Sequence, residues 1–276
     1  MLLPYRPPLA WHPLLSFLAA RAIPGVEVVT GDTYRRTIEV AGQSGHIEVS
    51  REPSRHALAM RAWLPDSRLL PTVVEKVSHI FDLAADPRVI AAHLGVDEVL
   101  ATRVRRLPGL RVPGAWDGFE LGVRAILGQQ VTVKGASTLA GRLVTMCGHP
   151  VASPSAGLSH LFPRPADLAA ADLSTLGVPR QRRVSLQTLA TAIADGRLSF
   201  TGHGVEAALD ALPGVGAWTV QYVLMRACGD PDAFPASDLW LRRSSGASST
   251  SALIARAEAW RPFRAYAAMY LWQAGA

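Results

Sequence analysis

The N-terminal part of the chain alternates apolar and polar residues in short runs, which is the pattern of antiparallel β-strands. Clusters of Gly, Pro or Ser separate the runs, which cover residues 26–29, 34–40, 45–49 and 56–62. Upstream, one face of an amphipathic helix is formed by Trp11, Leu14, Leu15 and Leu18. A second helix, over residues 70–81, is expected to cover the sheet. This pattern predicts an α+β domain, in which we find no catalytic constellation.

From Pro87 onward the spacing of apolar residues becomes helical and remains so. Residues 107–114 form a turn-rich linker, LPGLRVPG, which marks a boundary. Beyond this linker, Asp117 and Glu120 stand at the spacing of a capping box and predict the start of a helix.

That helix is interrupted at Gly128-Gln129-Gln130 and resumes at Val131. Two later segments are poor in helix-forming residues: 148–165, rich in Pro and Ser, and 243–251, rich in Ser. We expect both segments to be loops, and the chain after Ser251 to be helical.

The composition permits a nucleic-acid partner without establishing one. The chain has 276 residues, 49% of them hydrophobic, which is enough for a well-buried core and two or three domains. Its net charge is +6, and arginine supplies almost all of the positive charge, because Lys76 and Lys134 are the only lysines. A basic chain can bind nucleic acid, but an arginine-rich composition also arises from a high genomic GC content.

Cysteine and histidine usage argues against metal chemistry. Two cysteines, Cys147 and Cys228, cannot form a disulfide framework or a four-cysteine metal site, and the eight histidines lack metal-ligand spacing. We therefore expect no cofactor and no metal held by side chains.

No hydrophobic run approaches the length of a membrane span. The short apolar run at residues 14–20 soon reaches Arg21 and follows several prolines, so we interpret it as a buried helix rather than a secretory signal. We expect a cytoplasmic protein.

The candidate chemistry lies between Leu212 and Asp238, where the sequence reads LPGVGAWTVQYVLMRACGDPDAFPASD. Its first five residues predict a hairpin between two helices, in which Gly214 and Gly216 let the backbone take positive φ and approach another group closely. The helix that follows, from Ala217, begins with N–H groups that have no internal partner and that favour an anion such as phosphate.

Trp218 and Tyr222 are four residues apart and share one face of that helix. Aromatic residues at this spacing usually belong to the core, but these two directly follow the phosphate-binding turn. Their faces favour a flat, electron-poor or cationic ring. Trp272, near the C-terminus, is a candidate for another wall of such a pocket.

Asp238 precedes a helical run, so its ordinary interpretation is a helix N-cap, with Ser237 as an alternative cap. The functional interpretation uses the same position, because a helix N-terminus keeps a carboxylate ionised. An ionised carboxylate can stabilise an oxocarbenium-like sugar or orient water toward it. A base made cationic by alkylation leaves easily, and in a duplex it must first be flipped out.

The stretch LPGVGAWTVQYVLMR, followed by Asp238, resembles the helix-hairpin-helix, Gly/Pro-rich loop, Asp superfamily of DNA glycosylases. The flanks resemble the 3-methyladenine DNA glycosylase II, or AlkA, family nearly end to end, in PPLAWHPLLSFLAARAIPGVE, FDLAADPRVI, PGLRVPGAWDGFELGVRAILGQQV, LGVPRQRR and AEAWRPFRAYAAMYLW. The resemblance implies a TATA-binding-protein-like sheet domain over residues 1–88 and a central helical domain over 113–230. A third helical portion would combine residues 89–112 and 231–276, with the cleft between the helical parts.

The resemblance also assigns roles to individual residues. Asp238 is the catalytic carboxylate, and the base-pocket aromatics are Trp218, Tyr222 and Trp272. Gly214 and Gly216 belong to the turn whose backbone binds DNA phosphate, often together with a monovalent cation.

Three departures from the family pattern bear on specificity. Gln130 stands where the best-known relatives carry a leucine wedge, and we expect it to fill the gap left by the flipped base and to alter the dependence on the opposite base. Ser237 and Leu239 replace another Asp and a Tyr, which makes the pocket less suited to cations. Relatives that also nick the strand carry a lysine where this chain has Ala217-Trp218.

The sequence therefore predicts a monomeric, monofunctional DNA glycosylase that releases 3-methyladenine and 7-methylguanine from damaged double-stranded DNA and leaves an abasic site. Two alternatives stay open: a glycosylase for oxidised or deaminated bases, and a catalytically silent helix-hairpin-helix DNA-binding protein. Fusion to an alkyltransferase or regulatory domain, as in some relatives, also stays open.

Overall fold

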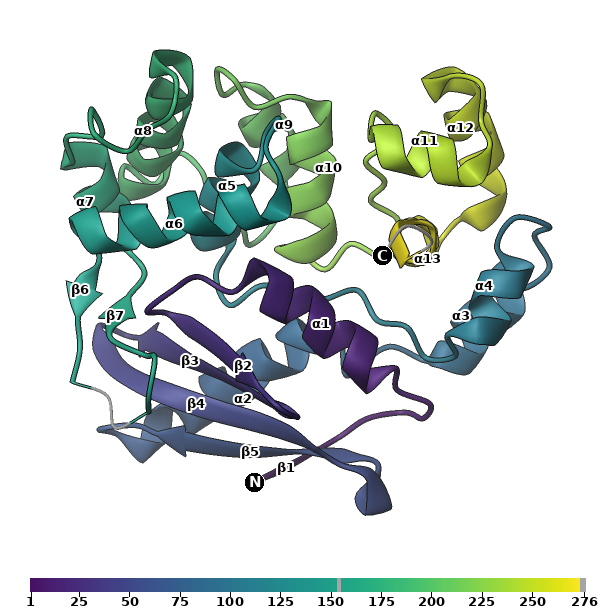
Figure 1. The fold of residues 1–276 in the computed structure, drawn as a ribbon, viewed down its shortest axis with the longest axis horizontal. Helices are drawn as coiled ribbons and strands as arrows, with labels where there is room; N and C mark the ends of the chain where they lie inside the picture. The colour runs from purple at the N-terminus through teal and green to yellow at the C-terminus, as the bar shows by residue number, and fades with distance from the viewer. Residues whose placement is uncertain (153–154, 274–276) are drawn as a thin grey trace.

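The N-terminal part of the chain is an antiparallel sheet with the strand order β1-β5-β4-β3-β2 (Figure 1). The computed structural model describes residues 1–152 and 155–273. The strands are β1 (Leu2–Pro4), β2 (Glu27–Thr30), β3 (Thr33–Val40), β4 (Gln43–Glu52) and β5 (Ala57–Trp63). The four runs of alternating residues are thus confirmed as strands. The fifth strand, β1, was not predicted, because three residues are too few to show a period of two.

Two helices cover one face of this sheet, α1 (Trp11–Arg21) and α2 (Leu70–Ile80) (Figure 1). The predicted apolar stripe of α1 is buried, from Trp11 to Leu18, and it packs with β-sheet residues and Phe81 in one core. One short 3-10 turn, Pro53–Arg55, connects β4 to β5, and another, Ser67–Leu69, connects β5 to α2. The α+β class predicted for this region is therefore confirmed.

The rest of the chain is a helical body with its own core (Figure 1). Its first part contains α5 (Gly118–Leu127), α6 (Val133–Cys147), α7 (Pro165–Ala170), α8 (Arg180–Ala194), α9 (Val205–Asp210) and α10 (Ala217–Arg226). The predicted break between α5 and α6 is confirmed, since α5 ends at Leu127 and α6 begins at Val133.

Helices near the C-terminus lie beside two helices that precede them by more than a hundred residues (Figure 1). The earlier pair is α3 (Pro87–Leu94) and α4 (Ala101–Arg106), and the later group is α11 (Leu239–Ser245), α12 (Thr250–Ala257), the 3-10 turn Glu258–Trp260 and α13 (Arg264–Trp272). Arg103 donates to the Ser244 carbonyl oxygen at 2.8 Å, and the Trp260 indole donates to Asp97 at 2.9 Å. These bonds hold the two distant segments together.

Both predicted loops contain regular structure that the sequence did not reveal. Within residues 148–165 the chain forms a short hairpin, β6 (His149–Pro150) and β7 (His160–Leu161), while residues 153–154 of this segment lie outside the described chain. The hairpin docks on the sheet domain, where the Thr37 hydroxyl donates to the His160 carbonyl at 2.6 Å. Such tertiary contacts explain order in a segment of weak propensity.

The Ser-rich segment is helical at both ends, so the prediction of a loop over residues 243–251 holds only for the turn at residues 246–249. Helix α11 continues to Ser245, and α12 begins at Thr250. Gly246, with φ of +70°, ends α11 in the left-handed conformation, and the Ser249 hydroxyl caps α12 by accepting from the Ala252 N–H. Capping at both sides of a short turn outweighs the low helix propensity of serine.

The predicted capping box at the start of α5 is only half formed. The Asp117 carboxylate accepts from the N–H groups of Phe119 and Glu120 and caps the helix. The Glu120 side chain does not return to the helix start, because it accepts from Arg36 of β3 at 2.7 Å and from Arg124 at 2.6 Å.

This pairing belongs to a buried charge cluster between the sheet domain and the helical body, formed by Glu27, Arg36, Glu120 and Arg124. Arg124 also pairs with Glu27, whose carboxylate accepts from the Tyr34 hydroxyl at 2.6 Å. Burial alone would raise the pKa of the Glu120 carboxyl, but Arg36 and Arg124 outweigh burial and lower this pKa to about 2. The cluster therefore pairs two acidic side chains with two guanidinium groups at the junction of the two parts.

Helices of the described chain are all too short or too polar to span a lipid bilayer.

Candidate active site

The hairpin joins α9 to α10 through residues 211–216, and Gly214 is its critical position. Gly214 has φ of +79°, and a Cβ atom added there would lie 2.1 Å from the Ser185 hydroxyl oxygen. Gly216 does not share this conformation: its φ is −95°, and a Cβ atom there would meet no other atom within 4 Å. The prediction that both glycines take positive φ was therefore wrong for Gly216.

The loop between α5 and α6 is tied to this hairpin. The Gln129 side-chain amide donates to the Gly214 carbonyl at 2.9 Å and to the Thr219 hydroxyl at 3.2 Å, and Arg182 donates to the Gln129 carbonyl at 2.7 Å. The adjacent Gln130 is exposed and has φ of +57°, a left-handed conformation that is uncommon outside glycine. The sequence suggested Gln130 as the side chain that fills the gap left by the flipped base. It did not reveal the contacts that Gln129 makes with the hairpin.

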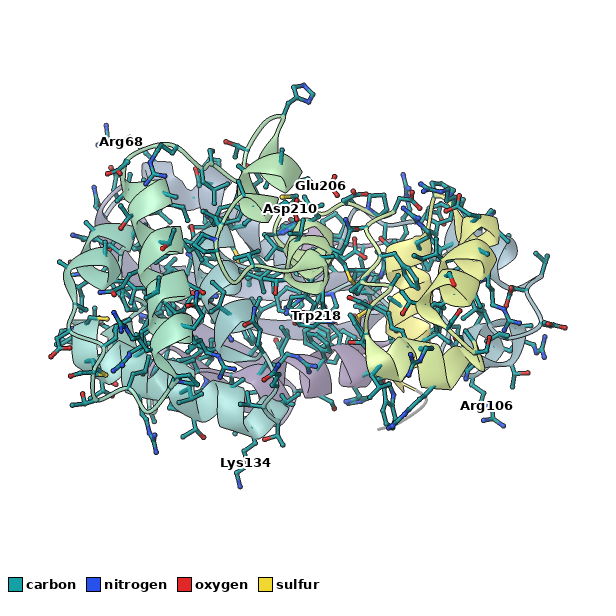
Figure 2. The ribbon with its side chains drawn as sticks, turned by 90° about the horizontal axis from the view of Figure 1, so that it is seen from above. Arg68, Arg106, Lys134, Glu206, Asp210 and Trp218 are labelled. Carbon is teal, nitrogen blue, oxygen red and sulfur yellow. The ribbon has the colours of Figure 1, made fainter. Side chains whose placement is uncertain are left out.

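The aromatic residues predicted for the pocket lie together. The rings of Trp218 and Tyr222 are stacked, with centroids 4.8 Å apart and an interplanar angle of 12°. Trp272, at the end of α13, meets Tyr222 edge to face with centroids 6.2 Å apart. Residues fifty or more positions apart in sequence thus form one aromatic wall. Figure 2 marks the position of Trp218 near the middle of the molecule.

Asp238 is both a helix cap and a group of the pocket. Its Oδ1 atom accepts from the N–H groups of Trp240 at 2.8 Å and Leu241 at 3.0 Å, which caps α11. Its Oδ2 atom accepts from the Trp218 indole N–H at 2.9 Å. The carboxylate is therefore held by α11 and by α10, and Trp218 is a donor that orients Asp238 as well as an aromatic wall. The sequence did not indicate this second role.

These residues line a cavity of about 410 Å³, a volume within the range of about 300–1,000 Å³ that is common for small-molecule sites. The cavity is bounded by Trp218, Tyr222, Trp272 and Asp238, by Gly128 and Val131 of the α5–α6 loop, and by residues of α1, α5 and α6. Of the residues proposed from the sequence, Gln130 lies next to this lining without being part of it.

None of the three arginines that line the cavity was predicted: Arg124 belongs to the buried charge cluster, and the other two are Arg21 and Arg226. Arg226 is buried and donates to the Tyr222 hydroxyl at 2.6 Å and to the carbonyls of Pro113 and Gly114 at 2.7 and 3.0 Å. Arg21, at the end of α1, lies over the Phe17 ring, 3.7 Å from its centroid. Burial alone would raise the pKa of the Tyr222 phenol, but the charges of Arg226 and Arg21 lower it.

A signal for Arg226 was present in the sequence, because Trp218, Tyr222 and Arg226 are spaced i, i+4, i+8 on one helix face. No comparable signal existed for Arg21, which is almost two hundred residues away from the hairpin.

Neither lysine reaches the cavity. Lys76 donates to the Trp116 carbonyl at 2.8 Å, and Lys134 points outward from α6, away from Trp218 (Figure 2). In the described parts of the chain, no cluster of His, Cys, Asp or Glu side chains could hold a metal ion.

Comparison with known families covers the stretch of sequence that contains the hairpin and Asp238. Residues 123–251 match the family model described as HhH-GPD superfamily base excision DNA repair protein, and residues 1–117 match the AlkA N-terminal domain. Within that superfamily, the chain belongs to the AlkA family.

Individual relatives extend the match over nearly the whole chain. The chain is 35% identical to DNA-3-methyladenine glycosylase 2 of Escherichia coli (strain K12), with 97% of this chain and 95% of that protein covered. It is 40% identical to a probable bifunctional transcriptional activator/DNA repair enzyme AlkA of Mycobacterium tuberculosis, with 98% of this chain but 56% of that protein covered. The chain thus spans about half the length of the M. tuberculosis relatives that it matches.

A solved structure of a 3-methyladenine DNA-glycosylase from Archaeoglobus fulgidus shares the fold, with a TM-score of 0.85 and 23% identity over 98% of this chain and 96% of that chain.

Proposed function

We propose that the protein is a base-excision DNA glycosylase that hydrolyses the N-glycosidic bond of alkylated purines in duplex DNA. The observation that supports this most is the position of Asp238, whose carboxylate is fixed by Trp218 at the edge of an aromatic cavity. The name of the E. coli relative, DNA-3-methyladenine glycosylase 2, points to the same activity, and the name of the M. tuberculosis relative points to DNA repair.

In the proposed reaction the damaged base is flipped out of the duplex and enters the cavity, where it stacks on the aromatic wall. The bond between C1′ and the base nitrogen breaks, and its electron pair passes to the base. Asp238 stabilises the positive charge that develops on the sugar and orients a water molecule. The water oxygen bonds to C1′, its proton is released to solvent, and an abasic site results.

The hairpin is proposed to bind the DNA backbone. The open space at Gly216 lets a phosphate approach the first N–H groups of α10. The carbonyl oxygens of Leu212 and Gly214 accept from the Val215 N–H and from Gln129, and each has a second lone pair with which it would hold a monovalent cation. Such a cation would supply positive charge for the DNA phosphate.

We propose Gln130 as the side chain that fills the gap left by the flipped base. Its left-handed backbone holds it exposed at the corner of the α5–α6 loop, which the bonds of Gln129 fasten to the hairpin. We propose that the chain is divided into three domains: residues 1–88, residues 113–230, and residues 89–112 together with 231–276. Trp218 and Asp238 then belong to different domains, and the cavity lies between these domains.

The direct test is release of free base from methylated duplex DNA. We expect the protein to release 3-methyladenine and 7-methylguanine, measured by chromatography of the supernatant, and to leave alkali-labile abasic sites. Binding that weakens as salt rises, without any base release, would instead identify a DNA-binding protein without glycosylase activity.

We also predict that the protein leaves the DNA strand intact. Strand-nicking glycosylases need an amine to form a Schiff base with the sugar. Here the helix begins with Ala217 and Trp218, and neither lysine lines the cavity. Borohydride should therefore trap no covalent adduct during turnover on a single-lesion duplex. A trapped band that disappears on replacing Lys134 would contradict this prediction.

A further inference from the structure

We infer that Arg182 is a positioning residue for base flipping: its guanidinium, together with the Gln129 side chain, holds the α5–α6 loop in the conformation that presents Gln130 to the DNA. This inference rests on the proposed glycosylase function and on the proposed role of Gln130. It adds a residue of α8 that lies outside the cavity lining. Arg182 acts on the step in which the base leaves the duplex, before the glycosidic bond breaks.

The α5–α6 loop is held from two sides, and both contacts are made by Gln129. On one side, the Arg182 guanidinium donates to the Gln129 carbonyl oxygen at 2.7 Å. On the other side, the Gln129 side-chain amide donates to the Gly214 carbonyl at 2.9 Å and to the Thr219 hydroxyl at 3.2 Å. Thr219 is only 3% exposed and belongs to α10. Gln129 therefore bridges α8 and the hairpin.

Helix α8 can hold the loop firmly because it is itself packed against the hairpin. Ser185 lies three residues after Arg182 and so on the same face of α8. A Cβ atom on Gly214 would lie 2.1 Å from the Ser185 hydroxyl oxygen, so the two backbones approach as closely as a glycine allows. Arg182 is half-buried and, among the described residues, pairs with no carboxylate. Its charge is thus available to strengthen the bond to the Gln129 carbonyl.

The backbone of Gln130 explains why the loop needs this support. Gln130 has φ of +57°, a left-handed conformation that a residue other than glycine keeps only where its surroundings hold it. Its own side chain is exposed and makes no hydrogen bond within the described residues, so the contacts of the adjacent Gln129 are what fix this corner.

A corner that is ordered before DNA binds loses little conformational entropy when it enters the gap in the duplex. A loosened corner must be ordered at that moment, which disfavours the flipped state. The bond-breaking step is unaffected, because the contacts of Asp238 with Trp218 and with α11 do not involve the loop.

The test compares 7-methylguanine in two duplexes, one with cytosine opposite the lesion and one with thymine, under single-turnover conditions. A mispaired base costs less to flip, so its release depends less on the corner. Arg182→Met should lower release from the paired duplex by about 10-fold, as expected for one lost hydrogen bond, and release from the mispaired duplex by less. Arg182→Lys should recover part of the rate, because an ammonium group can also donate to a carbonyl.

Arg183→Met is the matched control. It removes the same charge from the next position of α8, but Arg183 donates to the Ser174 carbonyl and not to the α5–α6 loop. We expect this control to keep the wild-type ratio of the two rates, and both variants to bind an undamaged duplex equally. If Arg182→Met alone weakens that binding and reduces the salt slope by about one, Arg182 is a phosphate contact and the inference is overturned.

Equal loss on both duplexes, or no loss in a folded variant, would also overturn the inference. If Arg182→Met unfolds, Gln129→Leu, which breaks the contact with the hairpin at the other side of the loop, is judged by the same ratio. A wild-type protein that releases 7-methylguanine, with variants that match it, would overturn the inference and leave the proposed function intact. A wild-type protein that releases the base from neither duplex would overturn the proposed function itself.

Discussion

Replacing Asp238 with asparagine is expected to lower the single-turnover rate of base release by about 10²- to 10⁴-fold, the range for removal of a positioned catalytic group. The amide has almost the shape of the carboxylate but no charge to offset the positive sugar. Its oxygen can still accept from the N–H groups of Trp240 and Leu241, so α11 keeps its cap. The variant therefore separates the chemical role of Asp238 from its structural role.

The measurement is the rate of 7-methylguanine release from a single-lesion duplex, together with the melting temperature and the affinity for that duplex. Asp195→Asn is the matched control, because Asp195 is exposed at the end of α8 and pairs with Arg197, two residues further along the chain. We expect the control to keep the wild-type rate. If Asp238→Asn keeps full activity, Asp238 is not the catalytic carboxylate. If its rate falls together with its melting temperature, the role of Asp238 is structural.

Glu120→Gln is expected to destabilise the fold by about 3–5 kcal/mol, as measured for buried ion pairs that lose one partner. The side chains of Glu120 and Arg36 are only 5% and 3% exposed. Without the Glu120 charge, Arg36 and Arg124 share Glu27 as their sole carboxylate partner among the described residues. The cluster joins the sheet domain to the helical body, so the two parts should also become less tightly coupled in denaturant unfolding.

The control is an exposed ion pair that joins the same two parts, Arg164 with Glu39, whose side chains are 50% and 26% exposed. Glu39→Gln should cost less than about 1 kcal/mol, because water screens this pair. If both substitutions reduce the free energy of unfolding equally, burial of the Glu120 cluster is not what stabilises the junction between the two parts.

The same carboxylate predicts a pH dependence. Although burial opposes it, the pairing with Arg36 and Arg124 lowers the pKa of Glu120 from its usual 4.5 to about 2 in the folded protein. A lowered pKa stabilises the fold above pH 4.5, and this contribution is lost as the pH falls toward 2. Unfolding measured between pH 6 and 3 should therefore be steeper in pH for the wild type than for Glu120→Gln.

Much of the secondary structure was predictable because it depends on short-range patterns. The alternating residues of β3 and β4 and the apolar face of α1 carry their signal within a few positions, and both the strands and the helix were confirmed. The segments at β6–β7 and at α11 were mispredicted because their order depends on docking and capping, which local propensity does not contain.

The candidate site was predictable in part for the same reason. Trp218, Tyr222 and Asp238 lie within one stretch, so their spacing marked them together, and the structure places them around one cavity. Trp272 could be named as a candidate wall from its residue type, but only the resemblance of the chain to the family assigned it to the pocket. Gln129 and Arg21 were missed because the contacts that bring them to the site come from elements far away in sequence.

The sequence by itself thus determined the α+β sheet domain, the helical body, the hairpin and the candidate carboxylate, because each of these is a local pattern of side chains. Only the tertiary structure decided what surrounds the carboxylate: the indole that orients Asp238, the guanidinium of Arg21 in the cavity, and the use of Glu120 as an ion-pair partner instead of a cap. The reason is physical, since charge compensation and hydrogen bonding in a buried site depend on distances between elements, which no local spacing specifies.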